Sequence, residues 1–291
     1  MSERPAAHAA PLLVFGSALF GLGSLIVKFV AVGSYAIAFW RLAVAAVLFL
    51  ILARALGHPF PRAPKAIGFA LLAGVFLAFD LALWHESIHA VGPGISTLLN
   101  SLQIFFLTAI GFFYYGERPR RLQLISLLLA VLGVGLISSP ELGQNQRAPW
   151  GIVSGIASGA LLALSMLSIR KTHQTEKTSL FPLMMLLSCG GALALIGPAL
   201  YFNGEALYPR TARDIGLVLI YGAVMQCVAW GLIAYAVPLL PLTLTGLLLL
   251  SEPVAALLLD YFYLHKPING LQWGGAGLTL AAIYLGSGTK R

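Results

Sequence analysis

The feature that most constrains this chain is a succession of apolar runs of 18 residues or more, separated by short polar gaps. A helix of roughly 20 apolar residues is long enough to cross the hydrocarbon core of a bilayer. Only helices and closed barrels satisfy their backbone groups in lipid, and barrel strands would alternate in hydropathy. These runs do not alternate. We therefore predict an all-α polytopic membrane protein.

Ten transmembrane helices are predicted, and Gly or Pro marks most of the short connections between them. With 59% hydrophobic and only 10% charged residues, the chain has more apolar surface than a soluble fold could bury. The N-terminus lacks the order of a signal peptide, so the first run is expected to be retained as a helix. The predicted spans lie near 11–32, 35–54, 66–89, 93–115, 121–139, 150–171, 179–202, 214–236, 241–263 and 269–287.

The basic residues are distributed unevenly between the two sides of these spans. If the N-terminus is cytoplasmic, 12 of the 18 Lys and Arg residues fall on the cytoplasmic side and 4 on the opposite side, while Lys28 and Arg41 lie within spans. Lys and Arg in short loops favour the cytoplasm. Both termini are therefore predicted to be cytoplasmic, in the bacterial inner membrane. The net charge of +8 follows the connections, so a nucleic-acid partner is not expected.

The chain also contains an internal repeat. Residues 112–138 align with 260–287, with Tyr115 on Tyr263 and Pro119 on Pro267. We predict two five-helix repeats, 1–140 and 150–291. Because five is odd, the second repeat must enter the membrane the opposite way round. Many secondary transporters have such inverted repeats and bind their substrate between them, near the midplane.

The order of several short motifs resembles the drug/metabolite transporter superfamily, EamA type, over nearly the whole chain. The matching residues are Lys28, Arg41 in FWRLAVAAVLF, Gly116-Glu117, Ser251-Glu252-Pro253-Val254-Ala255 and the Gly-rich last span. The resemblance implies ten helices and transport across the cytoplasmic membrane, often outward. Phe105 stands where the family often has proline, which predicts a straighter helix. Leu264-His265 replaces the second Gly-Glu, so His265 is not expected to inherit that acid's role.

Polar residues inside the spans are the candidate site, because they are costly in lipid unless they face protein or water. Asp80 and Trp84 share a helical face, and Asn100 and Gln103 form a stripe on the next helix. Together they could cradle a small polar or cationic substrate. The alternative is structural: Asp80 pairs with Lys28 or Arg41, and the amides join helices.

Four further residues complete the predicted substrate-binding set. Lys28 and Arg41 could meet an anionic group, although Lys28 could also reach the interface. Gln226 and Trp230 share a face of the eighth span.

Coupling or gating is assigned to Asp80, Glu252 and Pro253, since a proline frees a helix carbonyl and a buried carboxylate could exchange a proton. For Glu252, a structural role at the kink is the favoured alternative. Three other polar residues, His85, Glu86 and His89, are expected to reach the wet interface.

The leading function hypothesis is a secondary transporter that exports a small polar metabolite, such as an amino acid or related zwitterion, by alternating access. Efflux of cationic aromatic drugs and a lipid-handling membrane protein are the alternatives. No catalytic motif, metal-ligand spacing or cofactor motif is present, so we expect no enzyme activity and no cofactor. Cys189 and Cys227 are expected to be free thiols. The expected partners are a small-molecule substrate and membrane lipid, with proton coupling as an open option and a monomer or homodimer as the assembly.

Overall fold

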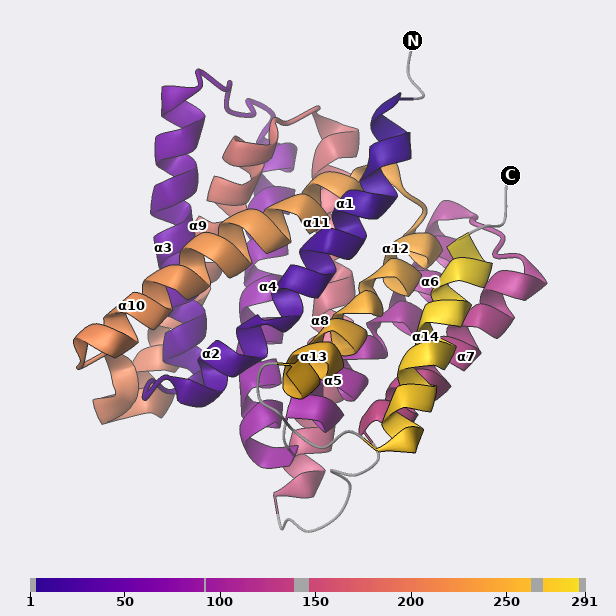
Figure 1. The fold of residues 1–291 in the computed structure, drawn as a ribbon. Coiled ribbons are helices and arrows are strands. Elements are labelled where there is room, and N and C mark those ends of the chain that lie inside the picture. Colours follow the sequence, from indigo (N-terminus) through magenta and orange to yellow (C-terminus); the bar gives the residue numbers. More distant parts are fainter. Residues whose placement is uncertain (1–3, 92, 139–146, 263–268, 288–291) are drawn as a thin grey trace.

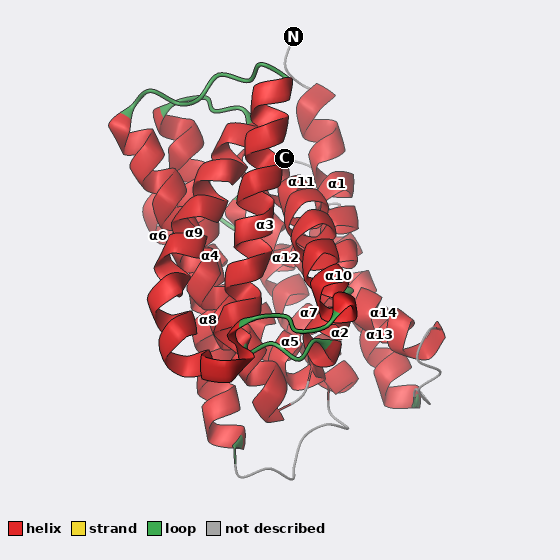
Figure 2. Ribbon diagram, turned by 90° about the vertical axis from the view of Figure 1, so that its left-hand side faces the viewer, coloured by secondary structure: helices red, strands yellow, loops and turns green. Residues whose placement is uncertain are grey.

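The fold is a bundle of helices whose long axes run between two faces, shown by a computed structural model (Figure 1). The structure describes residues 4–91, 93–138, 147–262 and 269–287. Within them no strand occurs, and the apolar runs form helices as the sequence predicts (Figure 2). We call the end that carries the N-terminus and the 56–63 connection the terminal face, and the other end the opposite face.

In the described part of the chain, ten spans run between these faces, and six of them are single helices. Five helical segments of this part are long and apolar enough by composition to cross a membrane, with bounds Ser34–Ala55, Pro64–Val91, Ala148–Thr175, Leu180–Asn203 and Ala212–Leu239. The single helices are α3 (Ser34–Ala55), α4 (Pro64–Val91), α7 (Arg121–Ser138), α8 (Ala148–Thr175), α9 (Leu180–Asn203) and α14 (Gly270–Ser287). The short 3₁₀ helix η2 (Gly204–Leu207) follows α9.

The other four spans are interrupted. They are α1 (Arg4–Gly21) with α2 (Gly23–Phe29); α5 (Pro93–Ser101) with α6 (Gln103–Tyr115); α10 (Ala212–Ile220), η3 (Tyr221–Trp230), α11 (Gly231–Ala236) and η4 (Val237–Leu239); and α12 (Leu242–Leu249) with α13 (Ser251–Phe262). Of these, η3 is a π-helix. Discontinuous helices are typical of transporter binding sites.

A leucine stands at three of the breaks with the same backbone geometry. Leu22, Leu102 and Leu250 each donate an amide to the residue three positions earlier, which tightens the turn. The break at Leu102 corrects the expectation that the absence of proline at Phe105 straightens this helix. The distance along the chain from Leu102 to Tyr115 equals that from Leu250 to Tyr263, so the two breaks match in the repeat.

Helix contacts follow the inverted repeat. The α3–α9 pair, the α7–α14 pair and the α6–α12 pair each join corresponding spans of the two halves. The α4–α8 pair in turn corresponds to the packing of α1 against η3 and α11, and the α4–α9 pair to that of α3 against η3. If each span is replaced by its counterpart in the other half, each of these contacts becomes either itself or another observed contact. Two inverted five-helix repeats account for this pattern.

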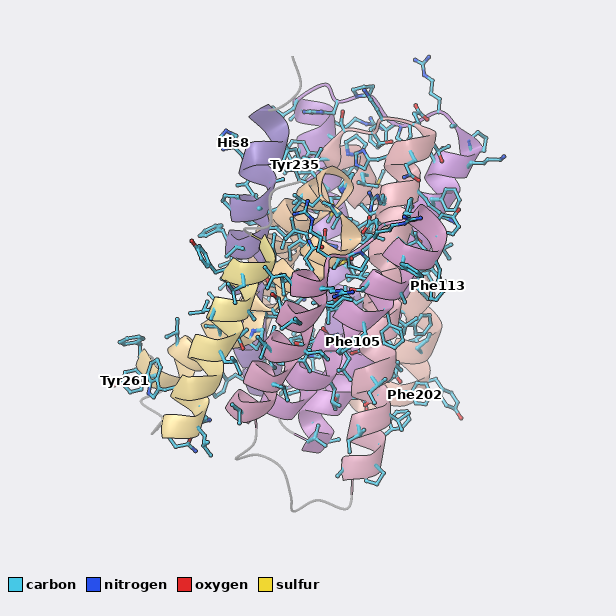
Figure 3. The ribbon with its side chains drawn as sticks, turned by 90° about the vertical axis from the view of Figure 1, so that its right-hand side faces the viewer. His8, Phe105, Phe113, Phe202, Tyr235 and Tyr261 are labelled. Atoms are coloured by element: carbon cyan, nitrogen blue, oxygen red, sulfur yellow. The ribbon has the colours of Figure 1, made fainter. Side chains whose placement is uncertain are left out.

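Small residues allow the closest of these contacts. A Cβ added to Gly74 of α4 would collide with the carbonyl of Leu187 in α9, and one added to Gly191 would lie 2.7 Å from the carbonyl oxygen of Gly74. Glycine at these positions lets the two backbones touch. The perimeter, by contrast, is covered by large exposed apolar side chains such as Phe113 and Phe202 (Figure 3). Both cysteines are free, as expected.

Candidate functional site

The guanidinium of Arg41 marks the centre of the candidate site. Arg41 lies in the first half of α3 and is only 1% exposed. Its Nε donates a hydrogen bond to Oε1 of Gln226 on η3 at 2.8 Å. The guanidinium carbon also lies 4.6 Å from the ring centres of both Phe20 and Tyr221. A cation held between two aromatic faces is stabilised by their negative π surfaces even away from water.

Phe20 joins the aromatic side of the site. Its ring centre lies 6.1 Å from that of Trp84 on α4 and 5.9 Å from that of Trp230 on η3. All three side chains are buried. The structure therefore brings together Arg41, Gln226, Trp84 and Trp230, which the sequence predicts on three separate spans.

Four nitrogen atoms on side chains of this site have no hydrogen-bond partner among the described residues. They are Nη2 of Arg41, Nε2 of Gln226 and the indole Nε1 atoms of Trp84 and Trp230. All four are N–H donors, and one is cationic. A buried donor without an acceptor costs about 1–3 kcal/mol, so native proteins rarely leave several together. A ligand that brings an acceptor would satisfy such donors, and a carboxylate would supply two acceptor oxygens.

The acidic side of the site begins at Asp80, on the same helix as Trp84. Asp80 is buried and accepts a hydrogen bond from Nδ2 of Asn100 at 3.0 Å. The same amide nitrogen donates to the hydroxyl of Ser158 on α8 at 2.9 Å. Asn100 therefore joins α5 to α4 and α8, which is the structural role predicted from the sequence as the alternative. Arg41 and Glu252 lie near enough to Asp80 to influence its carboxyl group electrostatically.

Glu252 and Pro253 lie in the first turn of α13, directly after the break at Leu250. Proline has no amide hydrogen, so the backbone before it loses one helical hydrogen bond. Glu252 is partly buried, and Arg41 acts electrostatically on it. Gln103, in the first turn of α6, is buried and its Oε1 has no partner among the described residues. The side chain of Lys28 lies outside the described residues.

Sequence reasoning missed the role of His85. It is fully buried rather than at a wet interface, which corrects the expectation, whereas its neighbour His89 is exposed. Its Nδ1 lies 3.0 Å from the carbonyl of Ser34, and its Nε2 lies 3.0 Å from the hydroxyl of Tyr221. A carbonyl can only accept, so Nδ1 carries a hydrogen. In the neutral ring, Nε2 then accepts from the Tyr221 hydroxyl, and this fixes the ring beside Arg41.

Phe20 and Tyr221 are the other residues that the sequence did not indicate. With 100° per residue, Tyr221 does not share a face with Gln226 or Trp230. In the structure all three belong to η3, and its i→i+5 hydrogen bonding widens the turn so that residues five apart approach one side. Neither residue has a charge, and no sequence pattern distinguishes them from lipid-facing aromatics.

A second polar cluster lies at the terminal face. Oε1 of Glu117, after α6, accepts from Nη1 of Arg170 on α8 at 3.0 Å and from the backbone amide of Leu242 at 3.1 Å. Leu242 begins α12, so one carboxylate bridges three spans from both halves. The Arg170 guanidinium carbon also lies 4.5 Å from the Tyr115 ring centre. We call these residues the terminal clamp.

The sequence model of the EamA-like transporter family matches the chain twice, over residues 8–139 and 149–288. Two curated relatives match most of the chain. An uncharacterized transporter of Bacillus subtilis, YetK, is 24% identical over 95% of this chain and 84% of its own length. A probable amino-acid metabolite efflux pump of Escherichia coli is 26% identical over 75% of this chain and 73% of its own.

A solved crystal structure has the same fold. Its TM-score to this chain is 0.77 over 98% of this chain and 96% of that one, with 14% sequence identity. The two matches of the family model cover most of the chain, one in each half. They indicate a multi-pass membrane transporter rather than an enzyme. The chain belongs to the EamA-like transporter family.

Proposed function

We propose that the protein is a secondary transporter that exports a small carboxylate-bearing metabolite, with an amino acid or related zwitterion as the leading class. The observation that carries this proposal is the set of four unpartnered donors on Arg41, Gln226, Trp84 and Trp230. Arg41 Nη2 and Gln226 Nε2 belong to side chains already joined by the hydrogen bond from Nε to Oε1, so their positions are fixed before a ligand arrives. Such a preorganised pair binds a carboxylate at low entropic cost.

The acidic residues supply the second half of a zwitterion site. Asp80 and Glu252 lie in the electrostatic field of Arg41 but form no salt bridge with it by distance in the described structure. An ammonium group of the substrate would neutralise one of these carboxylates. The rings of Phe20, Trp84 and Trp230 would contact its apolar part. The printed description of the Escherichia coli relative, an amino-acid metabolite efflux pump, supports the same class.

Alternating access would proceed by movement of the two halves about this site. The matched breaks at Leu102 and Leu250 lie next to Gln103 and Ser251, within the two spans that flank the site. A change at either turn would reorient α5 or α13 without breaking a continuous helix. Proton coupling through Asp80 or Glu252 belongs to the same proposal.

The test is a binding screen on the purified protein in detergent that varies the two charged groups of the ligand separately. For each amino acid, the panel holds the matching primary amine and the matching 2-hydroxy acid. A ligand that binds the folded state raises the melting temperature. We expect the amino acid to stabilise the protein, the amine to lose the effect, and Arg41→Lys to weaken it because lysine lacks the planar fork. Stabilisation by the amine alone, unchanged in Arg41→Lys, would contradict the proposal.

Transport by Asp80→Asn separates the acid's role from folding. The amide keeps an acceptor oxygen for Asn100, so the protein should stay folded in the membrane. Counterflow of the amino acid in proteoliposomes should fall roughly tenfold or more, since a hydrogen bond to a charged group is worth about 1.5–3 kcal/mol. Ser158→Ala, which removes the other partner of Asn100, is the matched control and should transport nearly normally. Wild-type transport by Asp80→Asn would remove the acid from the site.

The aromatic cluster favours one alternative, efflux of cationic aromatic compounds. The ring centres of Trp84 and Trp230 lie 6.1 and 5.9 Å from that of Phe20, and aromatic rings attract cations. That function predicts counterflow by several dissimilar cations that lack a carboxylate. The same proteoliposome assay distinguishes the two functions.

A further inference from the structure

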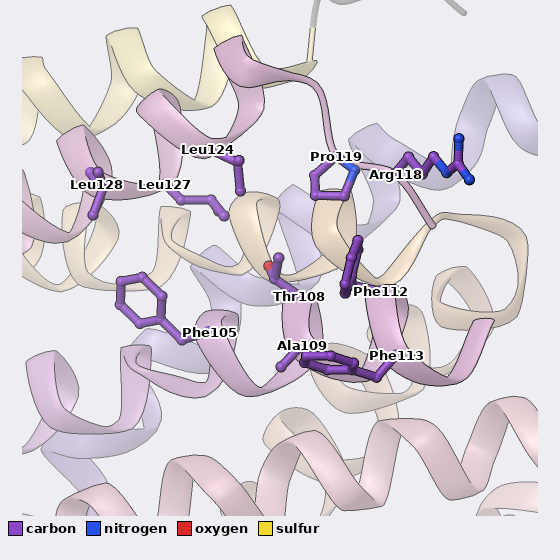
Figure 4. Close-up of a pocket in the computed structure, with 10 residues that line it drawn as sticks. All are labelled: Phe105, Thr108, Ala109, Phe112, Phe113, Arg118, Pro119, Leu124, Leu127 and Leu128. Atoms are coloured by element: carbon purple, nitrogen blue, oxygen red, sulfur yellow. The ribbon is translucent and has the colours of Figure 1, made fainter. Parts of the chain in front are cut away.

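A groove on the perimeter of the bundle is lined by residues that have no role in the proposed function. It lies between α6 and α7, has a volume of about 620 Å³, and is seen in Figure 4. One wall is formed by Phe105, Ala109 and Phe112 of α6. The other is formed by Leu124, Leu127 and Leu128 of α7. None of these residues belongs to the site around Arg41.

The groove exists because two consecutive helices diverge. The connection between α6 and α7 spans only residues 116–120, and such short connections usually join helices that pack side by side. Here α6 instead packs on α12 and α8, whereas α7 packs on α14 and α5. Several of the apolar side chains that line the groove are exposed, such as Phe112 and Leu128, and in a membrane an apolar chain would cover them.

The chemistry changes at the end of the groove. Arg118 and Pro119 line its end at the terminal face. Arg118 is exposed and forms no salt bridge within the described part of the chain. Arg120 and Arg121 follow within three positions, and both are exposed. The groove thus joins an apolar slot to one cationic side chain that lines it, Arg118, and two more arginines follow in the sequence.

Thr108 is the one neutral polar residue of the lining, and its hydroxyl oxygen is buried beneath the surface of the groove. The groove therefore offers apolar walls to an acyl chain and Arg118 to an anionic group at the terminal face, which is the order of a phospholipid from tail to headgroup.

We propose that this groove binds an anionic glycerophospholipid, with one acyl chain between α6 and α7 and the phosphate at Arg118. Charge complementarity decides for an anionic headgroup, because Arg118 lines this end and the nearest acid in the sequence, Glu117, is already held by Arg170. Basic pockets next to membrane helices are typical sites for such headgroups. A zwitterionic headgroup would also carry a positive charge, which Arg118 would repel.

The test uses the full-length protein in detergent and two lipids with identical oleoyl chains, phosphatidylglycerol and phosphatidylcholine. Native mass spectrometry counts the lipids that stay bound. We expect one retained phosphatidylglycerol and little phosphatidylcholine. Arg118→Gln should reduce the retained phosphatidylglycerol at least threefold, and Ala109→Trp, which fills the slot, should do the same. Arg62→Gln, on the same face but outside the groove, is the matched control and should retain the lipid.

Three results would overturn the proposal. They are equal retention of the two lipids by the wild type, retention of phosphatidylglycerol by both groove variants, and a change of oligomeric state in Ala109→Trp with lipid retention unchanged. The last result would assign the groove to a second copy of the chain. Circular dichroism of each variant confirms that it is folded before the comparison is made.

Discussion

The hydroxyl of Tyr221 lies 3.0 Å from Nε2 of His85, and both side chains are fully buried. This contact joins α4 to η3, and through Nδ1 of His85 it continues to the start of α3. The Tyr221 ring is also one of the two aromatic faces on Arg41. The His85 imidazole thus fixes the Tyr221 ring that lies over Arg41. His85 therefore acts as a positioning residue for the candidate site.

Tyr221→Phe tests this connection. The substitution keeps the ring over Arg41 but leaves Nε2 of His85 without a donor. Hydrogen bonds between membrane helices contribute about 0.6 kcal/mol on average and up to about 1.7 kcal/mol, so we expect the free energy of unfolding to fall by about 1 kcal/mol. Unfolding in mixed micelles measures it. Tyr235→Phe, at a residue 39% exposed, is the control. Equal stability of the two variants would show that the contact contributes nothing.

Gly74→Ala should separate α4 from α9. The added Cβ would collide with the Leu187 carbonyl, and a backbone atom has little freedom to move away. Overpacking costs about 1–3 kcal/mol, and this position should lie at the upper end. Gly68→Ala lies on the same helix with nothing within 4 Å of the new Cβ, so alanine's higher helix propensity should make that variant at least as stable as the wild type. Similar yields and melting temperatures for the pair would contradict the close approach.

Glu117→Gln should loosen the terminal clamp. The amide can still accept from the Leu242 amide but forms no ion pair with Arg170. Buried Thr243, next to the clamp on α12, can report the change as Thr243→Cys in a background that carries Cys189→Ala and Cys227→Ala. We expect a hydrophilic maleimide to label this thiol several times faster when Glu117→Gln is added. Thr245→Cys, two residues deeper in α12 and fully buried, should label slowly in both backgrounds. Unchanged labelling at position 243 would mean that the ion pair does not restrict access.

Acid should weaken a separate contact of the terminal face. The carboxylate of Glu176, after α8, accepts from the backbone amides of Ala63 at 2.7 Å and Arg62 at 2.9 Å, just before α4. These hydrogen bonds hold the pKa of Glu176 below its ordinary value of 4.5. The unfolded chain therefore binds the proton more tightly than the folded one. The contribution to stability is complete above pH 4.5 and is lost as the pH falls through the folded pKa.

Glu176→Gln should accordingly remove part of the decline in melting temperature below that pH. Arg62→Gln keeps the backbone donor and should retain most of the decline. If both variants follow the wild-type curve, other carboxylates dominate the acid response.

The sequence predicted the fold well because each span is an apolar run long enough to recognise alone. Charges inside the spans likewise identified Arg41, Asp80 and Glu252, since such groups need a partner or a function. The breaks at Leu22 and Leu102 could not be predicted, because a leucine with no neighbouring proline gives no local signal there. The π turn at Tyr221 depends on packing against α3, so Tyr221 and His85 could be recognised only once the helices were assembled.

The terminal clamp has a consequence for the balance between conformations. In the repeat, His265 stands at the position that corresponds to Glu117, so the sequence offers no second acid there to bridge helices at the opposite face. If the halves exchange shapes during transport, the two end states are then unequal in energy. In that exchange the ion pair between Glu117 and Arg170 would favour the state in which the terminal clamp is formed, and the binding energy of a substrate would have to offset its loss.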